Sequence, residues 1–205
     1  MSNDSITKHR RGIGGGLAFV VSGPSGAGKN SVIDRVMERL PGLSYSVSYT
    51  TRPPRPHEVP GRDYNFVSRE EFERLIAAGE LVEYVQYLGD YYGTAQHQIE
   101  EVFARGEDVV LNIDVQGAKT LREKGLLRFS VVYVFLSPSS LSRLEERLRA
   151  RGTEDDEEIR ARLTVAAQEL QAIPLFDYLV INDELERAVE ELSGIIIAER
   201  ARVID

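Results

Sequence analysis

Residues 17–31 read Leu-Ala-Phe-Val-Val-Ser-Gly-Pro-Ser-Gly-Ala-Gly-Lys-Asn-Ser. An apolar run comes first, a glycine-rich turn follows, and apolar residues at helical spacing come next. The turn matches the phosphate-binding pattern G-x-x-x-x-G-K-[ST] in its expected context of strand, loop and helix, except that Asn30 stands at the last position. The chain is therefore predicted to bind a nucleoside triphosphate at this loop.

The chemistry of the loop follows from its residue types. Gly23, Gly26 and Gly28 allow backbone torsions that turn successive N–H groups toward a phosphate. The helix that begins near Lys29 adds the positive end of its dipole, and the Lys29 ammonium reaches the β- and γ-phosphates. The predicted ATP-binding residues of this loop are Gly23, Ser25, Gly26, Ala27, Gly28, Lys29, Asn30 and Ser31.

Composition limits the class of protein. A length of 205 residues with 42% hydrophobic residues suits one compact α/β unit. A net charge of −8 argues against a general nucleic-acid binder, and no apolar run is long enough to cross a membrane. The absence of cysteine excludes disulfides and thiol nucleophiles and fits the cytoplasm. Residues 1–16 are expected to form a disordered leader.

Alternating strand-like and helical segments predict a parallel sheet covered by helices. The predicted core strands are 17–22, 108–113, 130–136 and 178–181. The predicted helices are 30–40, 97–105, 139–150, 156–172 and 184–199.

Two insertions are expected within a single domain over 17–199, whose core comprises about 17–43, 97–146 and 163–199. Residues 44–96 are rich in Ser, Thr, Tyr, Arg and Pro and predict a lobe with its own small sheet and a helix at 68–78, which Ser68 and Glu71 cap. Residues 147–162 are almost all charged and predict a helical lid. A solvated hairpin is the alternative interpretation of this second segment.

Residues 48–55 read Ser-Tyr-Thr-Thr-Arg-Pro-Pro-Arg. Arg52 and Arg55, stiffened by the prolines between them, form a fork suited to a doubly charged anion. The same segment also fits a polyproline ligand of an adaptor domain, although its position within a domain disfavours that interpretation.

Six segments together resemble the guanylate kinase family in order and spacing, over about 17–199. They are Gly-Pro-Ser-Gly-Ala-Gly-Lys, Ser-Tyr-Thr-Thr-Arg-Pro-Pro-Arg, Gly-Arg-Asp-Tyr-Asn-Phe-Val, Tyr-Tyr-Gly-Thr, Ile-Asp-Val-Gln-Gly-Ala and Arg-Gly-Thr-Glu. The resemblance implies a P-loop α/β core with a GMP-binding lobe and a lid, and an ATP:GMP phosphotransferase that uses Mg²⁺.

The resemblance also assigns roles to matching positions. Glu83 matches the carboxylate that reads guanine, Asn182 matches a residue near adenine, and Arg147, Arg151 and Arg162 match the lid arginines. Lys29, Arg52 and these three arginines are the implied catalytic residues. The implied GMP-binding residues are Ser48, Arg52, Arg55, Tyr64, Glu83, Tyr92, Thr94 and Asp114.

These residue types suit the chemistry. Guanine presents N1–H and N2–H₂ as adjacent donors, which the Glu83 carboxylate accepts together, whereas adenine would leave this carboxylate facing an acceptor. The attacking oxygen of GMP is already anionic, so that the transfer needs no general base. Catalysis is expected to consist of positioning and charge neutralisation.

Two asparagines depart from the family pattern near the metal. Asn30 replaces a Ser or Thr, and Asn112 stands where the family usually has Asp or Glu. Asn30 is a candidate Mg²⁺ ligand through its amide oxygen, and Asp114 is a candidate through water. We expect weakened Mg²⁺ use rather than loss of nucleotide binding; a neutral replacement within the sheet is the alternative for Asn112.

Two other functions remain open at this point. One is a guanylate-kinase-like module that binds a partner peptide and does not catalyse. The other is a P-loop kinase for a different phosphorylated substrate. The sequence leaves the oligomeric state open between monomer and homodimer.

Overall fold

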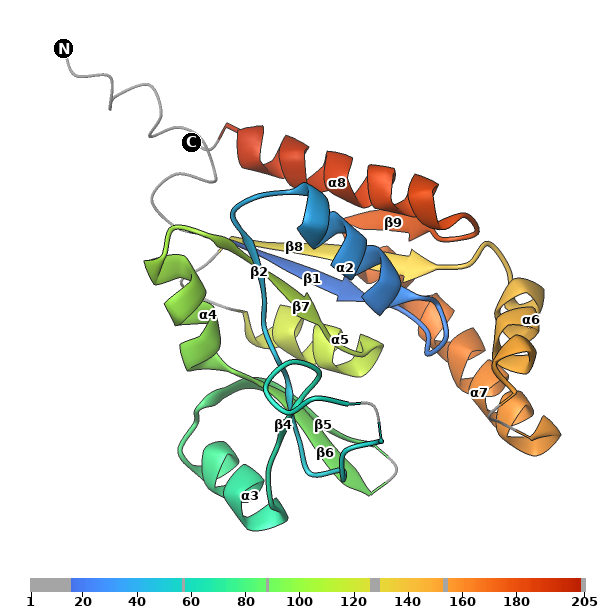
Figure 1. Ribbon diagram of the computed structural model, residues 1–205, viewed down its shortest axis with the longest axis horizontal. Helices are drawn as coiled ribbons and strands as arrows, with labels where there is room; N and C mark the ends of the chain where they lie inside the picture. Colours follow the sequence, from blue (N-terminus) through green and yellow to red (C-terminus); the bar gives the residue numbers. More distant parts are fainter. Residues whose placement is uncertain (1–15, 57, 88, 126–129, 153–154, 204–205) are drawn as a thin grey trace.

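The computed structural model describes residues 16–56, 58–87, 89–125, 130–152 and 155–203. Its centre is a five-stranded, wholly parallel sheet with the strand order β2-β7-β1-β8-β9 (Figure 1). The strands of this sheet are β1 (Leu17–Ser22), β2 (Leu43–Tyr45), β7 (Asp108–Asn112), β8 (Ser130–Ser137) and β9 (Tyr178–Ile181). Strands β2 and β7 lie on one side of β1, and β8 and β9 lie on the other. In such sheets, ligands bind at the carboxyl ends of the strands, near the point where the strand order changes direction.

Helices cover both faces of the sheet because the apolar side chains of β1 alternate between two cores. Leu17, Phe19 and Val21 belong to one core, whereas Ala18 and Val20 belong to the other. Helices α2 (Lys29–Arg39) and α8 (Leu185–Ala201) pack on the first face, and α4 (Gln96–Ala104) and α5 (Val115–Lys124) on the second (Figure 1).

A second, four-stranded sheet forms a lobe at one side of the molecule, with the order β4-β3-β6-β5. Its strands are β3 (Tyr49–Thr50), β4 (Asn65–Phe66), β5 (Leu81–Tyr87) and β6 (Asp90–Ala95), and its helix is α3 (Arg69–Ala77). The Phe72 ring of α3 is fully buried and stacks on Tyr91 with ring centroids 5.1 Å apart. The lobe therefore has an apolar contact of its own between helix and sheet.

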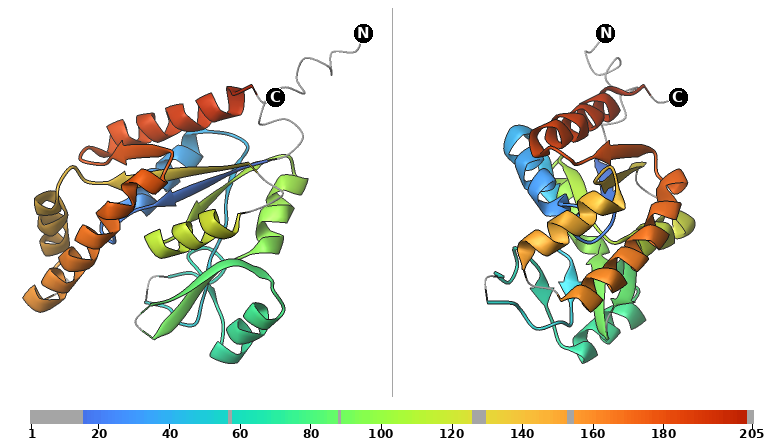
Figure 2. Two further views of the ribbon diagram at one scale, coloured as in Figure 1. Left: turned by 180° about the vertical axis from the view of Figure 1, so that it is seen from behind. Right: turned by 90° about the vertical axis from the view of Figure 1, so that its right-hand side faces the viewer.

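A helical hairpin projects beyond the sheet on the side of the glycine-rich loop (Figures 1 and 2). It consists of α6 (Leu141–Arg151) and α7 (Asp156–Glu169), and a 3₁₀ helix (Leu170–Leu175) leads from α7 to β9. A capping box starts α7, in which the Asp155 side chain accepts from backbone N–H groups and the Glu158 side chain accepts from the Asp155 N–H. Leu144, Leu148 and Ile159 are buried between the two helices, so the charged segment has a small apolar core.

The predicted α/β class, parallel sheet, lobe and helical hairpin are confirmed, but the hairpin predicted as a lid over 147–162 extends in both directions, over the whole of α6 and α7. The predicted strands and helices all occur, with ends that shift by a few residues. The helix at 156–172 ends at Glu169, where the 3₁₀ turn begins. Two elements went unpredicted. Strand β2 is short and half-polar, and α5 carries a glycine and several charges in its ten residues.

One predicted boundary is wrong, and another lies outside the described residues. The lobe was expected to begin at residue 44, but β2 pairs with β7 in the central sheet, so that the second sheet begins after it. The expectation for residues 1–16 lies outside the described residues, apart from Gly16. Over the described part of the chain, none of the helices is both long and apolar enough to span a membrane.

Candidate active site

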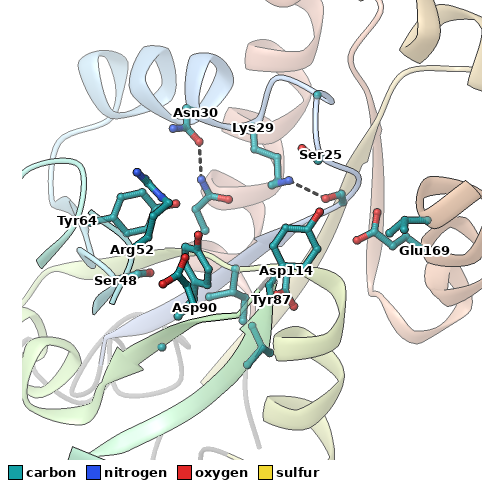
Figure 3. Close-up of a pocket in the computed structure, with 18 of the residues that line it drawn as sticks. Ser25, Lys29, Asn30, Ser48, Arg52, Tyr64, Tyr87, Asp90, Asp114 and Glu169 are labelled. Carbon is teal, nitrogen blue, oxygen red and sulfur yellow. Dashed lines mark hydrogen bonds between the residues drawn. The ribbon is translucent and has the colours of Figure 1, made fainter. Parts of the chain in front are cut away.

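A pocket of about 550 Å³ lies where the carboxyl edge of the central sheet meets the lobe and α7. The glycine-rich loop after β1 lines one side, and Arg52 and Tyr64 of the lobe lie on the opposite side (Figure 3). Asn112 at the end of β7 and Asp114 beyond it also line the pocket. Arg162 and Glu169 of α7 close one side. The central sheet, the lobe and α7 thus all contribute side chains to a single pocket.

The glycine-rich loop takes backbone torsions that other residues avoid. Gly28, the N-cap of α2, lies in the left-handed region with φ 86°. A Cβ atom there would come 2.6 Å from Nδ2 of the buried Asn182, which donates to the Ala27 carbonyl at 2.7 Å. Asn182 therefore holds the loop in place through this hydrogen bond.

The Lys29 side chain folds back over this loop. Its ammonium donates to the Gly23 carbonyl oxygen at 2.6 Å (Figure 3) and to the Pro24 carbonyl oxygen at 3.2 Å. Arg162 reaches the loop from α7 and donates to the Ser25 hydroxyl at 2.9 Å. Two cations from different elements thus lie at the same loop, where they would meet an anion.

The two asparagines that the sequence singled out contact each other. Asn112 donates through Nδ2 to Oδ1 of Asn30 at 2.6 Å, and both side chains line the pocket (Figure 3). Asn112 also hydrogen-bonds to Tyr45, whose pKa is raised to about 12, chiefly by burial. Asn112 therefore bridges the central sheet and the start of α2.

In the lobe, Arg52 lies against aromatic rings. Its guanidinium carbon is 5.5 Å from the ring centroid of Tyr64 and 5.8 Å from that of Phe66. Tyr64 packs edge-on against Tyr92 at 6.0 Å, and burial raises the pKa of Tyr64. Arg52 and these tyrosines line the pocket together with Ser48 and Arg55.

Glu83 is the most perturbed acid of the pocket. Only 3% of it is exposed, and burial raises its pKa to about 7, with the negative charge of Asp114 adding to the effect. Thr94 donates to its Oε1 at 2.6 Å. A Cβ on Gly117, in the first turn of α5, would come 2.7 Å from its Oε2, so that a glycine there leaves space for the carboxylate.

Asp114 has a structural task as well as a place in the pocket. It is the N-cap of α5, and its Oδ1 accepts from the Gly117 N–H at 2.6 Å. Glu169 also lines the pocket, and burial raises its pKa while Lys29 opposes the rise. Glu169 therefore lies within electrostatic reach of the Lys29 ammonium.

The structure brings together most of the predicted site residues. Those that line the pocket are Gly23, Ser25, Gly26, Gly28, Lys29, Asn30, Ser31, Ser48, Arg52, Arg55, Tyr64, Glu83, Tyr92, Asp114 and Arg162. Ala27, Thr94 and Asn182 are buried directly behind them and hold the Gly28 region or Glu83.

The lid arginines differ from one another. Arg147 donates to the Ala27 carbonyl at 3.3 Å and to the carbonyls of Asn182 and Asp183, so it supports the loop from outside the pocket. Arg151 ends α6, and its side chain lies outside the described residues. Contact of these two with phosphate stays a prediction.

Several pocket residues were missed in the sequence. Tyr87, Asp90, Val165 and Glu169 line the cavity without belonging to a recognisable motif. They lie in β5, β6 and α7, whose packing alone decides which face meets the cavity. The raised pKa of Glu169 is a structural signal that the sequence does not carry.

The comparisons with known proteins agree with this geometry. The guanylate kinase family model matches residues 16–199. The chain belongs to the guanylate kinase family. It is 47% identical over 189 residues to a guanylate kinase of Symbiobacterium thermophilum, covering 92% of this chain and 88% of that protein. A guanylate kinase of Thermotoga maritima is 44% identical over 92% of this chain and 89% of its own length.

A solved structure supports the same assignment. The crystal structure of guanylate kinase from Anaplasma phagocytophilum is 34% identical and superposes with a TM-score of 0.73, covering 92% of this chain and 88% of that one. The family and the fold that the sequence motifs predicted are therefore confirmed.

Proposed function

We propose that this member of the guanylate kinase family transfers the γ-phosphoryl group of ATP to GMP, giving ADP and GDP. The observation that carries the proposal is the buried Glu83 carboxylate, which the Thr94 hydroxyl orients in a pocket that the phosphate-binding loop shares. Such a carboxylate matches the two adjacent donors of guanine and rejects adenine.

The two phosphate-bearing substrates would enter from opposite walls. The loop 23–31 would hold the ATP phosphates through its N–H groups and Lys29, with Arg162 beside it. Ser48, Arg52, Arg55, Tyr64 and Tyr92 would surround the GMP phosphate. Both substrates would then direct their reacting atoms toward the space between Lys29 and Arg52.

The chain's residues contribute positioning and positive charge. The GMP oxygen that attacks is already an anion, so a base is not needed. Lys29 and Arg162 would stabilise the charge on the transferred group, and the lid would exclude water from it. The asparagine Asn182 and Arg147 would act indirectly, by holding the Ala27 carbonyl and hence the loop.

Mg²⁺ belongs to the proposal as the partner of ATP, whose phosphate charge it neutralises when bound. Asn30 and Asp114 offer oxygen atoms, the ligand type that this ion prefers, so the residues present fit it. The Asn30 oxygen, however, already accepts a hydrogen bond from Asn112. We infer that the pair weakens the direct hold on Mg²⁺ that a hydroxyl would provide.

The test is ADP production from ATP with GMP, AMP, CMP or UMP as acceptor, across a Mg²⁺ titration. Turnover with GMP alone supports the proposal. Turnover with another acceptor would favour a different P-loop kinase, and folded protein without turnover at any Mg²⁺ concentration would favour a non-catalytic binding module. A cytoplasmic location, where ATP and GMP are available, is part of the proposal.

A further inference from the structure

The segment between Arg55 and Tyr64 contains an acid that the proposed reaction does not use. Glu58 forms a two-pronged ion pair with Arg52: Oε1 accepts from Nη2 at 2.7 Å and Oε2 accepts from Nη1 at 3.0 Å. Both side chains are only 16% exposed. Hydrogen bonding between them raises the pKa of Arg52 and lowers that of Glu58, so both stay charged.

Glu58 also holds the second arginine of the fork. Its Oε2 accepts from the Arg55 backbone N–H at 2.7 Å, and its own N–H donates to the Arg55 carbonyl at 3.0 Å. One carboxylate therefore fixes the side chain of Arg52 and the backbone of Arg55 at the same time. Paired, half-buried groups of this kind are worth more than exposed ion pairs.

The remaining contacts of Arg52 define which edge is left for a ligand. Nη1 uses its second hydrogen on the Pro53 carbonyl at 2.7 Å, and the ring of Tyr64 lies under the guanidinium plane. A guanidinium has five N–H donors in a planar fork. These bonds to Glu58 and Pro53 account for three of them, which leaves Nε–H and one hydrogen of Nη2 on the other edge. Hydrogen bonding to the Tyr92 side chain also raises the pKa of Arg52.

The position of Glu58 shows whether it supports phosphate binding by Arg52 or competes with the phosphate for it. The described residues that line the pocket include Arg52, Arg55 and Tyr92 but not Glu58. The carboxylate that holds Arg52 thus does not itself line the cavity. A competitor for phosphate would occupy the edge that faces the cavity.

We propose that Glu58 is a positioning residue, which grips one edge of Arg52 so that its other edge, Nε–H and Nη2–H, is aimed at the phosphate of the monophosphate substrate. This proposal rests on the proposed function, since it names how the acceptor site of that reaction is preorganised. Orienting a bidentate donor before binding lowers the ordering cost of association.

The experiment compares Glu58→Gln with Glu71→Gln in steady-state kinetics with GMP and ATP. Glu71 forms a similar two-pronged pair with Arg74 at 3.0 and 2.7 Å on α3 of the same lobe, away from the pocket, and serves as the matched control. For Glu58→Gln we expect the KM for GMP to rise about tenfold, with the KM for ATP and kcat nearly unchanged. The control variant should match the wild type in all three constants.

A double-mutant cycle with Arg52→Met separates positioning from general support of the lobe. If Glu58 acts through Arg52, adding Glu58→Gln to Arg52→Met changes the GMP affinity no further. Three results would overturn the proposal: an unchanged KM for GMP, a lower KM for GMP, or an additive effect in the Arg52→Met background. Calorimetric GMP binding gives the same comparison if a variant turns over too slowly. Failure of the wild type to phosphorylate GMP would instead refute the proposed function.

Discussion

The loop after β1 and the loop after β3 are the two proposed phosphate sites, and they differ in the groups that form them. In the first, glycine torsions and backbone N–H groups form the cradle, and Lys29 rests on neutral carbonyl oxygens of Gly23 and Pro24. In the second, the cations are side chains, and Arg52 is held by the charged carboxylate of Glu58. The cation proposed to meet the γ-phosphate thus donates to backbone carbonyl oxygens, whereas the one proposed to meet the acceptor phosphate is held in an ion pair.

The largest expected effect tests the first of these loops. Lys29→Met removes the ammonium from the loop, and kcat should fall by about 10³, as for other groups that stabilise transition-state charge. The measurement is ADP production at saturating ATP and GMP. Lys119→Met, on α5 outside the pocket lining, is the control and should keep wild-type activity. A loss of less than tenfold in Lys29→Met would contradict the role given to Lys29.

The next largest expected effect concerns Glu83, the residue proposed to recognise guanine. Glu83→Gln replaces one acceptor oxygen by a donor that faces a donor of guanine, and kcat/KM for GMP should fall about 10²-fold. Glu73→Gln, an exposed acid on α3, is the control. Thermal unfolding of both variants separates folding from binding. An unchanged preference for GMP over AMP in Glu83→Gln would show that another residue reads the base.

The raised pKa of Glu83 gives a smaller, pH-dependent effect. Guanine needs the carboxylate form, and with a pKa of about 7 the ionised fraction rises about tenfold between pH 6 and pH 8. KM for GMP should therefore fall about tenfold over this range, and Glu83→Gln should lose that change. The ionisation of the GMP phosphate, at about pH 6, is common to both proteins. A KM with the same pH profile in both would contradict the assignment.

The same group links stability to pH. The folded protein, in which the pKa of Glu83 is about 7, keeps this proton at higher pH than the unfolded chain, which releases it near the ordinary pKa of 4.5. Between these values the folded state binds more protons, so this group makes the free energy of unfolding fall as the pH rises. Denaturant titrations of the wild type and Glu83→Gln at pH 5 and pH 7 measure the difference.

The smallest expected effect concerns Asn30, the proposed Mg²⁺ ligand in the loop after β1. Asn30→Ser restores a hydroxyl and frees Asn112 from its hydrogen bond, so the Mg²⁺ concentration for half-maximal activity should fall about fivefold. Calorimetry of ATP binding with and without Mg²⁺ gives a second readout, in which only the titration with Mg²⁺ should change. Equal Mg²⁺ dependence in both proteins would mean that Asn30 does not limit the use of the metal.

The difference between the two loops also explains what the sequence could predict. A site built from backbone groups needs several glycines at fixed spacing, so residues 23–31 could be recognised in the sequence. Arg52 and Glu83 could be recognised through the family resemblance. Glu58 was not, because a carboxylate six residues from its partner has no periodicity, and only the turn at Arg55 brings the two together. Helix α5 was missed for a related reason: its start depends on the Asp114 cap and on the space that Gly117 leaves beside Glu83.

The most direct test of the two-site account is calorimetric titration of ATP and, separately, of GMP into Lys29→Met and Arg52→Met. The account predicts a crossed result, in which Lys29→Met weakens ATP binding and keeps GMP binding, and Arg52→Met weakens GMP binding and keeps ATP binding. If either variant weakened both nucleotides equally while remaining folded, the two walls of the pocket would not be separate phosphate sites, and the account would be wrong.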